Sequence, residues 1–104
     1  MAMIISDSNF EEIVLKSNLP VMLDIYTEWC GPCRAVAPYI EQLATEYEGK
    51  VVIGKVDAEK CPEVAKKYEI RTVPTFVFIK DGVEVNRENG ANKSGITEKL
   101  KALL

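Results

Sequence analysis

Short apolar segments alternate with segments of helical pattern along this chain, and this alternation limits the fold more than any other feature of the sequence. Residues 2–6, 20–27 and 51–57 are short, apolar and typical of strands. The segment from Cys33 to about Glu48 has apolar residues at helical spacing instead. Strands that alternate with helices favour an α/β architecture.

Local signals place the boundaries of these helices. Ser8 and Glu11 have the spacing of a capping box, followed by a helical face that contains Phe10. Gly49 is expected to end the long helix, and Pro38 should kink it because its ring displaces the carbonyl four residues earlier. We expect a further short helix at 61–68 and an amphipathic closing helix at 93–104.

A hairpin is expected near the C-terminus, with strands at 75–80 and 83–87 joined by Asp81-Gly82. The predicted order of elements is therefore βαβαβαββα. The first three strands can lie parallel through helical crossovers, and the hairpin supplies the antiparallel part. With 104 residues, the chain 1–104 is expected to be one domain.

Composition narrows the classes of protein to which the chain can belong. Its net charge is −3, with both signs interspersed, so the basic stripe of a nucleic-acid binder is absent. No apolar run approaches the ~20 residues of a membrane span. The start "MAMIISDSNF" lacks the pattern of a signal peptide, so we expect a cytoplasmic protein. Its three cysteines should rest there as thiols.

Cys30 and Cys33 are separated only by Gly31 and Pro32, and three interpretations of this pair are open. A closed zinc site needs four ligands, but the chain has three cysteines and no histidine. A structural disulfide over so short a loop stabilises a fold by only about 2 kcal/mol. Redox chemistry fits better, because Cys30 lies at a strand-to-helix junction where helix N–H groups favour a thiolate. Cys33, one turn later, is placed to resolve a mixed disulfide on Cys30.

The motif "WCGPC", residues 29–33, resembles the active-site signature of the thioredoxin family. The resemblance continues through "DIYTEWCGPC", "VDAEKCPEVAKKYEIRTVPTF" and "NGANK", from about Ile4 to Leu104. It implies the thioredoxin fold, a central mixed five-stranded sheet flanked by four helices. It also implies a protein-disulfide reductase without bound cofactor or metal. A thioredoxin reductase, supplied indirectly by NADPH, would regenerate the dithiol of a monomer.

Two charged residues in strand-like segments are candidates for the active site. Asp24 stands in the apolar run "VMLDIY", where a buried carboxylate would have a raised pKa and could accept a proton from Cys33. The resemblance implies this role and implies that Lys55 tunes Asp24. The alternatives are an Asp24 at a strand edge that reaches solvent and an ordinary solvated Lys55.

Pro74 and its neighbours are candidates for substrate binding. The resemblance implies a cis-proline opposite the cysteines, whereas a trans proline at a strand entry is the alternative. Because proline has no N–H, the backbone of Val73 should be free to bind an extended substrate segment, and Thr72 is a further candidate for substrate binding. Trp29, Gly90 and Ala91 are expected to complete an apolar rim, with Gly90 allowing close backbone approach. Core packing of Trp29 is the alternative.

Several positions depart from the family pattern. Tyr26 occupies a position where many relatives have tryptophan, and Thr72 one where glycine or lysine is frequent. The segment before Gly90, which ends in Asn89, is more polar than usual. These departures bear on partner preference. Cys61 is additional to the active pair. We expect Cys61 to be inert, with regulatory oxidation or an intermolecular disulfide as alternatives.

Two other functions remain compatible with the sequence. One is an oxidase or isomerase of an oxidising compartment, which the Gly-Pro dipeptide argues against. The other is a non-catalytic binding module that uses the apolar rim. The hypothesis of a protein-disulfide reductase fits Cys30, Cys33 and their surroundings best.

Overall fold

The apolar segment at 20–27 forms the central strand of the sheet in the computed structural model, which describes residues 1–104. This strand, β2 (Val21–Tyr26), is buried at five of its six positions. The five strands lie in the order β1-β3-β2-β4-β5. Strands β1 (Met3–Ile5) and β3 (Val52–Asp57) run parallel to β2, while β4 (Thr75–Lys80) runs antiparallel to it. Strand β5 (Val83–Asn89) pairs antiparallel with β4, so the sheet is mixed as expected.

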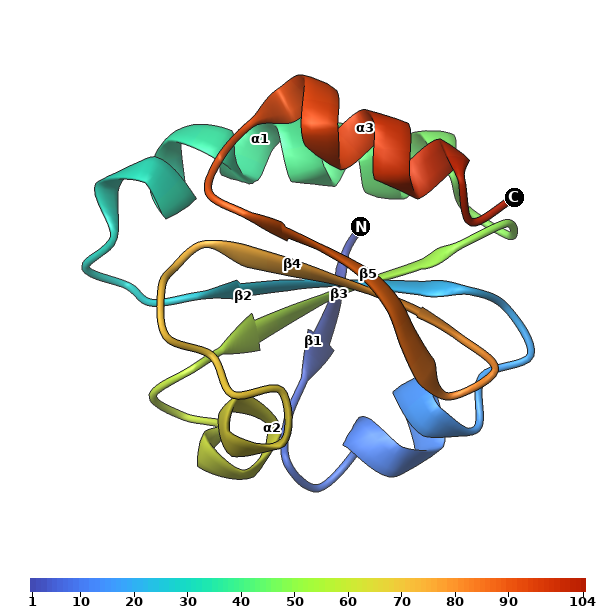
Figure 1. The fold of residues 1–104 in the computed structure, drawn as a ribbon, viewed down its shortest axis with the longest axis horizontal. Coiled ribbons are helices and arrows are strands. Elements are labelled where there is room, and N and C mark those ends of the chain that lie inside the picture. The colour runs from blue at the N-terminus through green and yellow to red at the C-terminus, as the bar shows by residue number, and fades with distance from the viewer.

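Helices cover both faces of this sheet. Figure 1 shows α1 (Gly31–Glu46) and α3 (Lys93–Lys101) on one face, with α2 (Pro62–Lys67) and the short helical turn η1 (Glu11–Leu15) on the other. None of these helices combines the length and the apolar character that a bilayer-spanning segment requires. The observed order of strands and helices confirms the predicted order.

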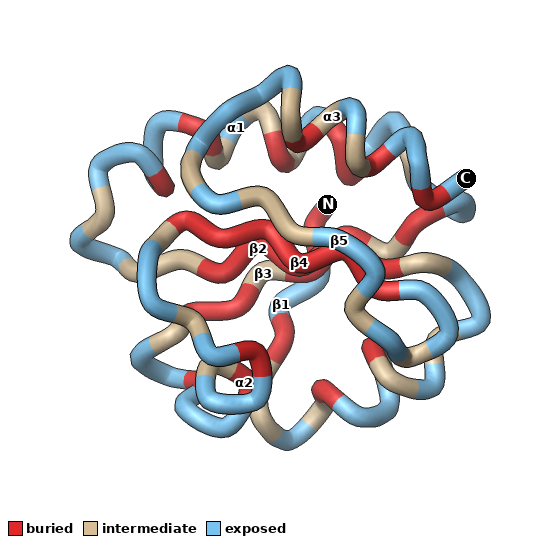
Figure 2. Tube along the Cα trace, in the orientation of Figure 1, coloured by how far each residue is buried: buried red, intermediate tan, exposed pale blue.

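Each face of the sheet has its own core because side chains alternate along a strand. In β4, Phe76 and Phe78 point toward α1 and α3, whereas Val77 and Ile79 point toward α2 and η1. Figure 2 shows the buried backbone concentrated in β2 and β4 and on the inner sides of the helices. Burying one such large side chain contributes roughly 1.5–3 kcal/mol, so the two layers fix the sheet between them.

The first helical segment differs from the prediction. No side chain caps η1 through Ser8 and Glu11. Instead, the N–H of Ser6 donates to Asn9 Oδ1 at 2.8 Å, and the N–H of Asn9 donates to Ser6 Oγ at 3.2 Å. The capping box therefore lies two residues earlier, with asparagine in the position expected for glutamate.

The long helix also begins earlier than expected. Helix α1 starts at Gly31 with Cys30 as its N-cap, contains Pro38 in its interior, and ends at Glu46. The C-cap is Tyr47 and not Gly49 as expected; Gly49 lies two residues later at φ +80°, a conformation that favours glycine, in the turn that follows the helix. The early start matters because it places Cys30, not Cys33, at the helix terminus.

The hairpin has the expected turn. Asp81 and Gly82 both have positive φ, of 53° and 78°, as a two-residue hairpin turn requires. Strand β5 extends two residues beyond the predicted end, to Asn89, and a register irregularity lies opposite Phe78 and Ile79. The extension brings residues 89–91 to the edge of the sheet where β4 begins, because Thr75 pairs with Asn89.

Gly54 provides a test of the packing between strands. A Cβ at this position would lie 2.7 Å from Ile5 Cγ1 and 3.2 Å from Leu23 Cδ2. We therefore expect Gly54→Ala to lower the free energy of unfolding by about 1–3 kcal/mol through overpacking, measured by urea denaturation.

The matched control is the same substitution in an Ile5→Ala background. If the contact with Ile5 causes the loss, Gly54→Ala should cost clearly less in that background, because the clashing atoms are gone. An equal cost in both backgrounds would contradict this account.

Candidate functional site

The Cys30–Cys33 pair lies where β2 passes into α1. Cys30 is the N-cap of α1, and the N–H of Cys33 donates to Cys30 Sγ at 3.1 Å. Pro32 lies in the first turn, where a missing N–H costs no hydrogen bond. The two cysteines form a disulfide, with their Cα atoms 5.2 Å apart. The structure therefore holds the oxidised form of a pair whose first sulfur receives a helix N–H.

The two sulfurs differ in their access to solvent. Cys33 is only 4% exposed, while Cys30 is partly exposed. Trp29, next to Cys30, is 82% exposed, so the alternative that it packs in the core is wrong. An incoming partner can reach Cys30 but not Cys33.

The loop before β4 faces Cys30 from the other side. The Val73–Pro74 peptide bond is cis, which is the isomer that the resemblance implied. The carbonyl oxygen of Val73 lies 3.7 Å from Cys30 Sγ, and its N–H donates to no backbone group. Thr72, one residue earlier, is exposed, and its carbonyl accepts a hydrogen bond from Thr75 Oγ1 at 2.7 Å. A stretch of free backbone therefore lies beside the accessible sulfur.

Gly90 and Ala91 lie next to this loop. The N–H of Gly90 donates to the carbonyl of Pro74 at 2.8 Å, and Ala91 is exposed. The expected reason for glycine at position 90 was wrong: a Cβ there would meet no atom within 4 Å. Its φ of +97° is the requirement, since side chains other than hydrogen disfavour that conformation.

Asp24 is buried beneath the cysteines in β2. It is 1% exposed, so the alternative of a strand-edge residue that reaches solvent is wrong. Its Oδ1 has no hydrogen-bond partner. Burial raises the pKa of Asp24 to about 6, while the charge of Lys55 opposes this rise and that of Glu41 adds to it. Its carboxyl group therefore titrates close to neutral pH.

Asp24 and Cys33 line the same cleft. The cleft has a volume of about 290 Å³, and its other lining residues are Tyr26, Thr27, Glu28, Arg34, Ala37 and Lys55. Lys55 is the direct neighbour of Asp24 in the parallel pairing of β2 and β3. Its Nζ lies 4.9 Å from the centre of the Tyr26 ring, which holds the ammonium group at this cleft.

Glu28 and Glu41 act on this cleft and were not anticipated. Glu28 lines the cleft and forms an ion pair with Lys60 at 3.4 Å. Glu41 lies in α1, seventeen positions after Asp24, and its influence on Asp24 depends on how the helix packs over the sheet. No local pattern in the sequence marks either residue.

Cys61 lies apart from the active pair. It is the N-cap of α2 and is 3% exposed. Its thiol donates to the carbonyl of Ile5 at 3.3 Å, and burial raises its pKa. An un-ionised thiol that solvent cannot reach fits the expected inert role.

Comparison with known proteins places this geometry in a family. The family model described as Thioredoxin matches residues 1–102. Thioredoxin M-type, chloroplastic, from Spinacia oleracea is 41% identical over 101 residues, which are 96% of this chain and 56% of that protein. Thioredoxin 1 from a Nostoc species is 44% identical over 87 residues, which are 84% of this chain and 81% of that protein. Thioredoxin C-2 from Corynebacterium nephridii is 45% identical over 86 residues.

The chain thus spans little more than half of the spinach protein and about four fifths of the Nostoc one. The matched region includes the cysteine pair and all five strands of the sheet. The chain belongs to the thioredoxin family of dithiol–disulfide oxidoreductases, and Cys30–Cys33 is its redox-active disulfide.

Proposed function

We propose that this chain is a protein-disulfide reductase, in which Cys30 attacks substrate disulfides and Cys33 resolves the product. One observation carries the proposal: a partly exposed Cys30 sulfur receives a helix N–H while its partner Cys33 is buried behind it. Residues 1–104 would act as one catalytic domain.

In the first step, the Cys30 thiolate of the reduced protein attacks one sulfur of the substrate disulfide. The substrate S–S bond breaks, a mixed disulfide forms on Cys30, and one substrate thiolate leaves and takes up a proton. The N–H of Cys33 and the helix dipole favour the thiolate by up to ~2 kcal/mol. Gly31 and Pro32 hold both cysteines in the first turn of α1.

In the second step, Cys33 loses its proton and attacks Cys30 Sγ. The Cys30–Cys33 disulfide forms, the mixed disulfide breaks, and the second substrate sulfur leaves as a thiolate that is protonated. Two electrons pass from the protein to the substrate, while Cys33 releases one proton and solvent supplies the other proton that the two substrate thiols need. Asp24 is the proposed acceptor of the Cys33 proton, because both residues line one cleft and the pKa of Asp24 is about 6. Lys55 limits how far that pKa rises.

The substrate segment would bind in extended form beside Cys30. The unpaired N–H and the carbonyl of Val73 offer the backbone partners of an added strand. Trp29, Thr72, Gly90 and Ala91 form the proposed contact surface around it, with the buried Pro74 behind them, and the exposure of Trp29 supports this. The specificity of that surface depends on side chains, because backbone pairing does not distinguish sequences.

The remaining partners follow from family membership. Members generally act with a thioredoxin reductase and with disulfide-containing substrate proteins. We propose that such a reductase, supplied by NADPH, regenerates Cys30 and Cys33 here, that the chain acts as a monomer, and that it works in a reducing compartment such as the cytoplasm. Relatives include a chloroplastic protein as well as bacterial ones.

Substitution of the cysteines tests the reductase. Cys30→Ser should lower the rate of insulin disulfide reduction to that of dithiothreitol alone, because no nucleophile remains. Cys33→Ser should accumulate a mixed disulfide with the substrate, detected by mass spectrometry, because nothing resolves it.

Cys61→Ala is the matched control and should keep the wild-type rate, since its thiol is buried away from the pair. Full activity of Cys30→Ser would contradict the proposal, and failure of the wild-type protein to reduce insulin would favour a binding module. A strongly oxidising equilibrium with glutathione would favour an oxidase instead.

Asp24→Asn should raise stability and lower activity together. The folded-state pKa of about 6 exceeds the ordinary value of 3.8, so the carboxylate opposes folding wherever it is charged. The gain in free energy of unfolding should reach about 3 kcal/mol above pH 7 and vanish as the pH falls from 6 to 4. Urea denaturation at several pH values measures this gain. Reduction of a disulfide substrate at pH 7 should slow by roughly tenfold or more.

Asp57→Asn serves as the comparison. Asp57 is also buried, but its carboxylate accepts the N–H of Glu59 at 3.0 Å and does not line the cleft. It should give neither the stability gain nor the slow reduction. A pH-independent effect of Asp24→Asn would contradict the assignment of Asp24.

A further inference from the structure

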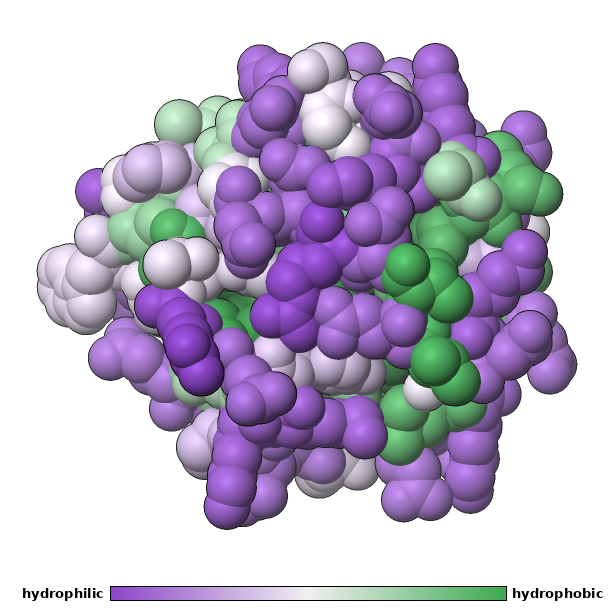
Figure 3. All heavy atoms as spheres, in the orientation of Figure 1, coloured by the Kyte–Doolittle hydropathy of each residue, from purple (hydrophilic) through white to green (hydrophobic).

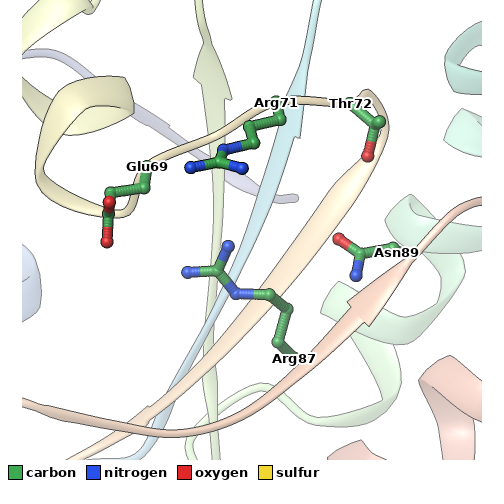
Figure 4. Close-up of a pocket in the computed structure, with 5 residues that line it drawn as sticks. All are labelled: Glu69, Arg71, Thr72, Arg87 and Asn89. Atoms are coloured by element: carbon green, nitrogen blue, oxygen red, sulfur yellow. The ribbon is translucent and has the colours of Figure 1, made fainter.

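A second pocket lies beside the loop that faces Cys30. It has a volume of about 450 Å³ and is lined by Glu69, Arg71, Thr72, Arg87 and Asn89. The first three residues precede β4, and the last two lie in β5. Figure 4 shows the guanidinium groups of Arg71 and Arg87 facing one another, with Thr72 and Asn89 beyond them. In Figure 3, hydrophilic side chains dominate this face over β4 and β5.

Most polar groups of this pocket are unpaired hydrogen-bond donors. Arg71 makes no hydrogen bond and no ion pair within the protein, so its whole guanidinium group is free. Arg87 is held in place by Glu84 at 2.7 Å and by the carbonyl of Tyr68 at 2.8 Å, which leaves its Nη1 free. Asn89 Oδ1 lies 3.2 Å from Thr75 Oγ1, whose single proton is shared with the closer Thr72 carbonyl at 2.7 Å, so the free donors of the pocket are those of Arg71 and Arg87. A set of free donors fits an anionic acceptor.

Glu69 is the one acidic side chain that lines the pocket, and it does not neutralise the arginines. It forms no ion pair with Arg71 or Arg87. In Figure 4 its carboxylate lies to one side of the gap between the two guanidinium groups. The chain as a whole carries −3 and Glu84 already pairs with Arg87, so the attraction for a substrate carboxylate comes mainly from the unpaired charge of Arg71, with Arg87 Nη1 as a further donor.

The pocket adjoins the backbone that faces the reactive sulfur, because Thr72 lines it and Val73 follows Thr72 in a bend. Arg71 is two residues before Val73, whose carbonyl is 3.7 Å from Cys30 Sγ. An extended segment advances about 3.3 Å per residue and returns to the same face every second residue. A substrate strand paired at Val73 with its cysteine at Cys30 therefore brings a side chain about two residues away to this pocket.

We propose that Arg71 and Arg87 bind a carboxylate of the substrate polypeptide, located about two residues from the cysteine that Cys30 attacks. This specificity site rests on the proposed reductase function. It makes disulfides that are flanked by an acidic group the preferred substrates. The carboxylate can belong to an acidic side chain or to a chain terminus that lies at the same distance.

Synthetic disulfide peptides separate these sources. One peptide carries glutamine on both sides of the cysteine and an amidated C-terminus. Two others carry glutamate two residues before or two residues after it, and a fourth has a free terminal carboxylate two residues after it. The rate constant for reduction by the pre-reduced protein should be roughly fivefold higher for at least one acidic peptide than for the neutral one.

Variants test whether the arginines cause the preference. Arg71→Gln and Arg87→Gln should each bring the acidic-to-neutral ratio close to one while leaving the neutral peptide's rate unchanged. Arg71→Lys should retain only part of the ratio, because lysine lacks the planar fork. Lys80→Gln removes the same charge from an exposed position outside the pocket and should keep the full ratio. Arg71 has no internal partner, so its replacement tests the site even if Arg87→Gln unfolds.

Equal rates for all four peptides, or a preference that survives both glutamine substitutions, would overturn the proposal. Failure to reduce even the neutral peptide would count against the reductase function instead. The same peptides with serine in place of cysteine keep the two questions separate: calorimetry should give tighter binding of an acidic peptide to wild type than to Arg71→Gln, and equal binding would overturn the pocket assignment.

Discussion

The antiparallel pairing of β2 with β4 determines the geometry of the whole site. Ile25 near the end of β2 pairs with Thr75 at the start of β4. The helix that follows β2 and the loop that precedes β4 must therefore meet at the same end of these two strands. Cys30 and Val73 are 43 residues apart in sequence and become neighbours for this reason. A parallel β4 would place that loop at the opposite end of the strands, away from the cysteines.

Burial of Asp24 ties the chemistry to the stability of the sheet. A carboxylate at the centre of β2 is unfavourable in its charged form, and no donor satisfies its Oδ1. The same burial brings its pKa close to the pH at which a thiol proton must be accepted. An apolar residue at this position would pack better but could not accept a proton. The protein therefore keeps a locally unfavourable group inside its most buried strand.

Local patterns in the sequence predicted much of the fold, while long-range contacts lay beyond them. The Asp81-Gly82 turn and the order of elements depend on neighbouring residues, and both were predicted correctly. The strand order was not predicted, because it depends on which strands pair. The cap at Ser6 and Asn9 was missed, because asparagine occupies the usual position of glutamate. Gly90 was assigned the wrong cause, although Asn89-Gly90 is the same kind of positive-φ signal as Asp81-Gly82.

The candidate site shows the same division. The spacing of Cys30 and Cys33 and the isolated charge of Asp24 could be identified from single segments. Arg71 and Arg87 could not be connected, because they meet only through the pairing of β4 with β5.

These two polar regions have different tasks around one sulfur. The cleft with Asp24 lies behind the buried Cys33, where we propose that the thiol proton leaves. The pocket with Arg71 lies beside Val73, where we propose that substrate backbone binds. Different strands supply the cleft and the pocket. A change of charge in the pocket with Arg71 can therefore leave the pKa of Asp24 in the cleft unaltered. Substrate preference can therefore vary in this fold while the exchange chemistry stays constant.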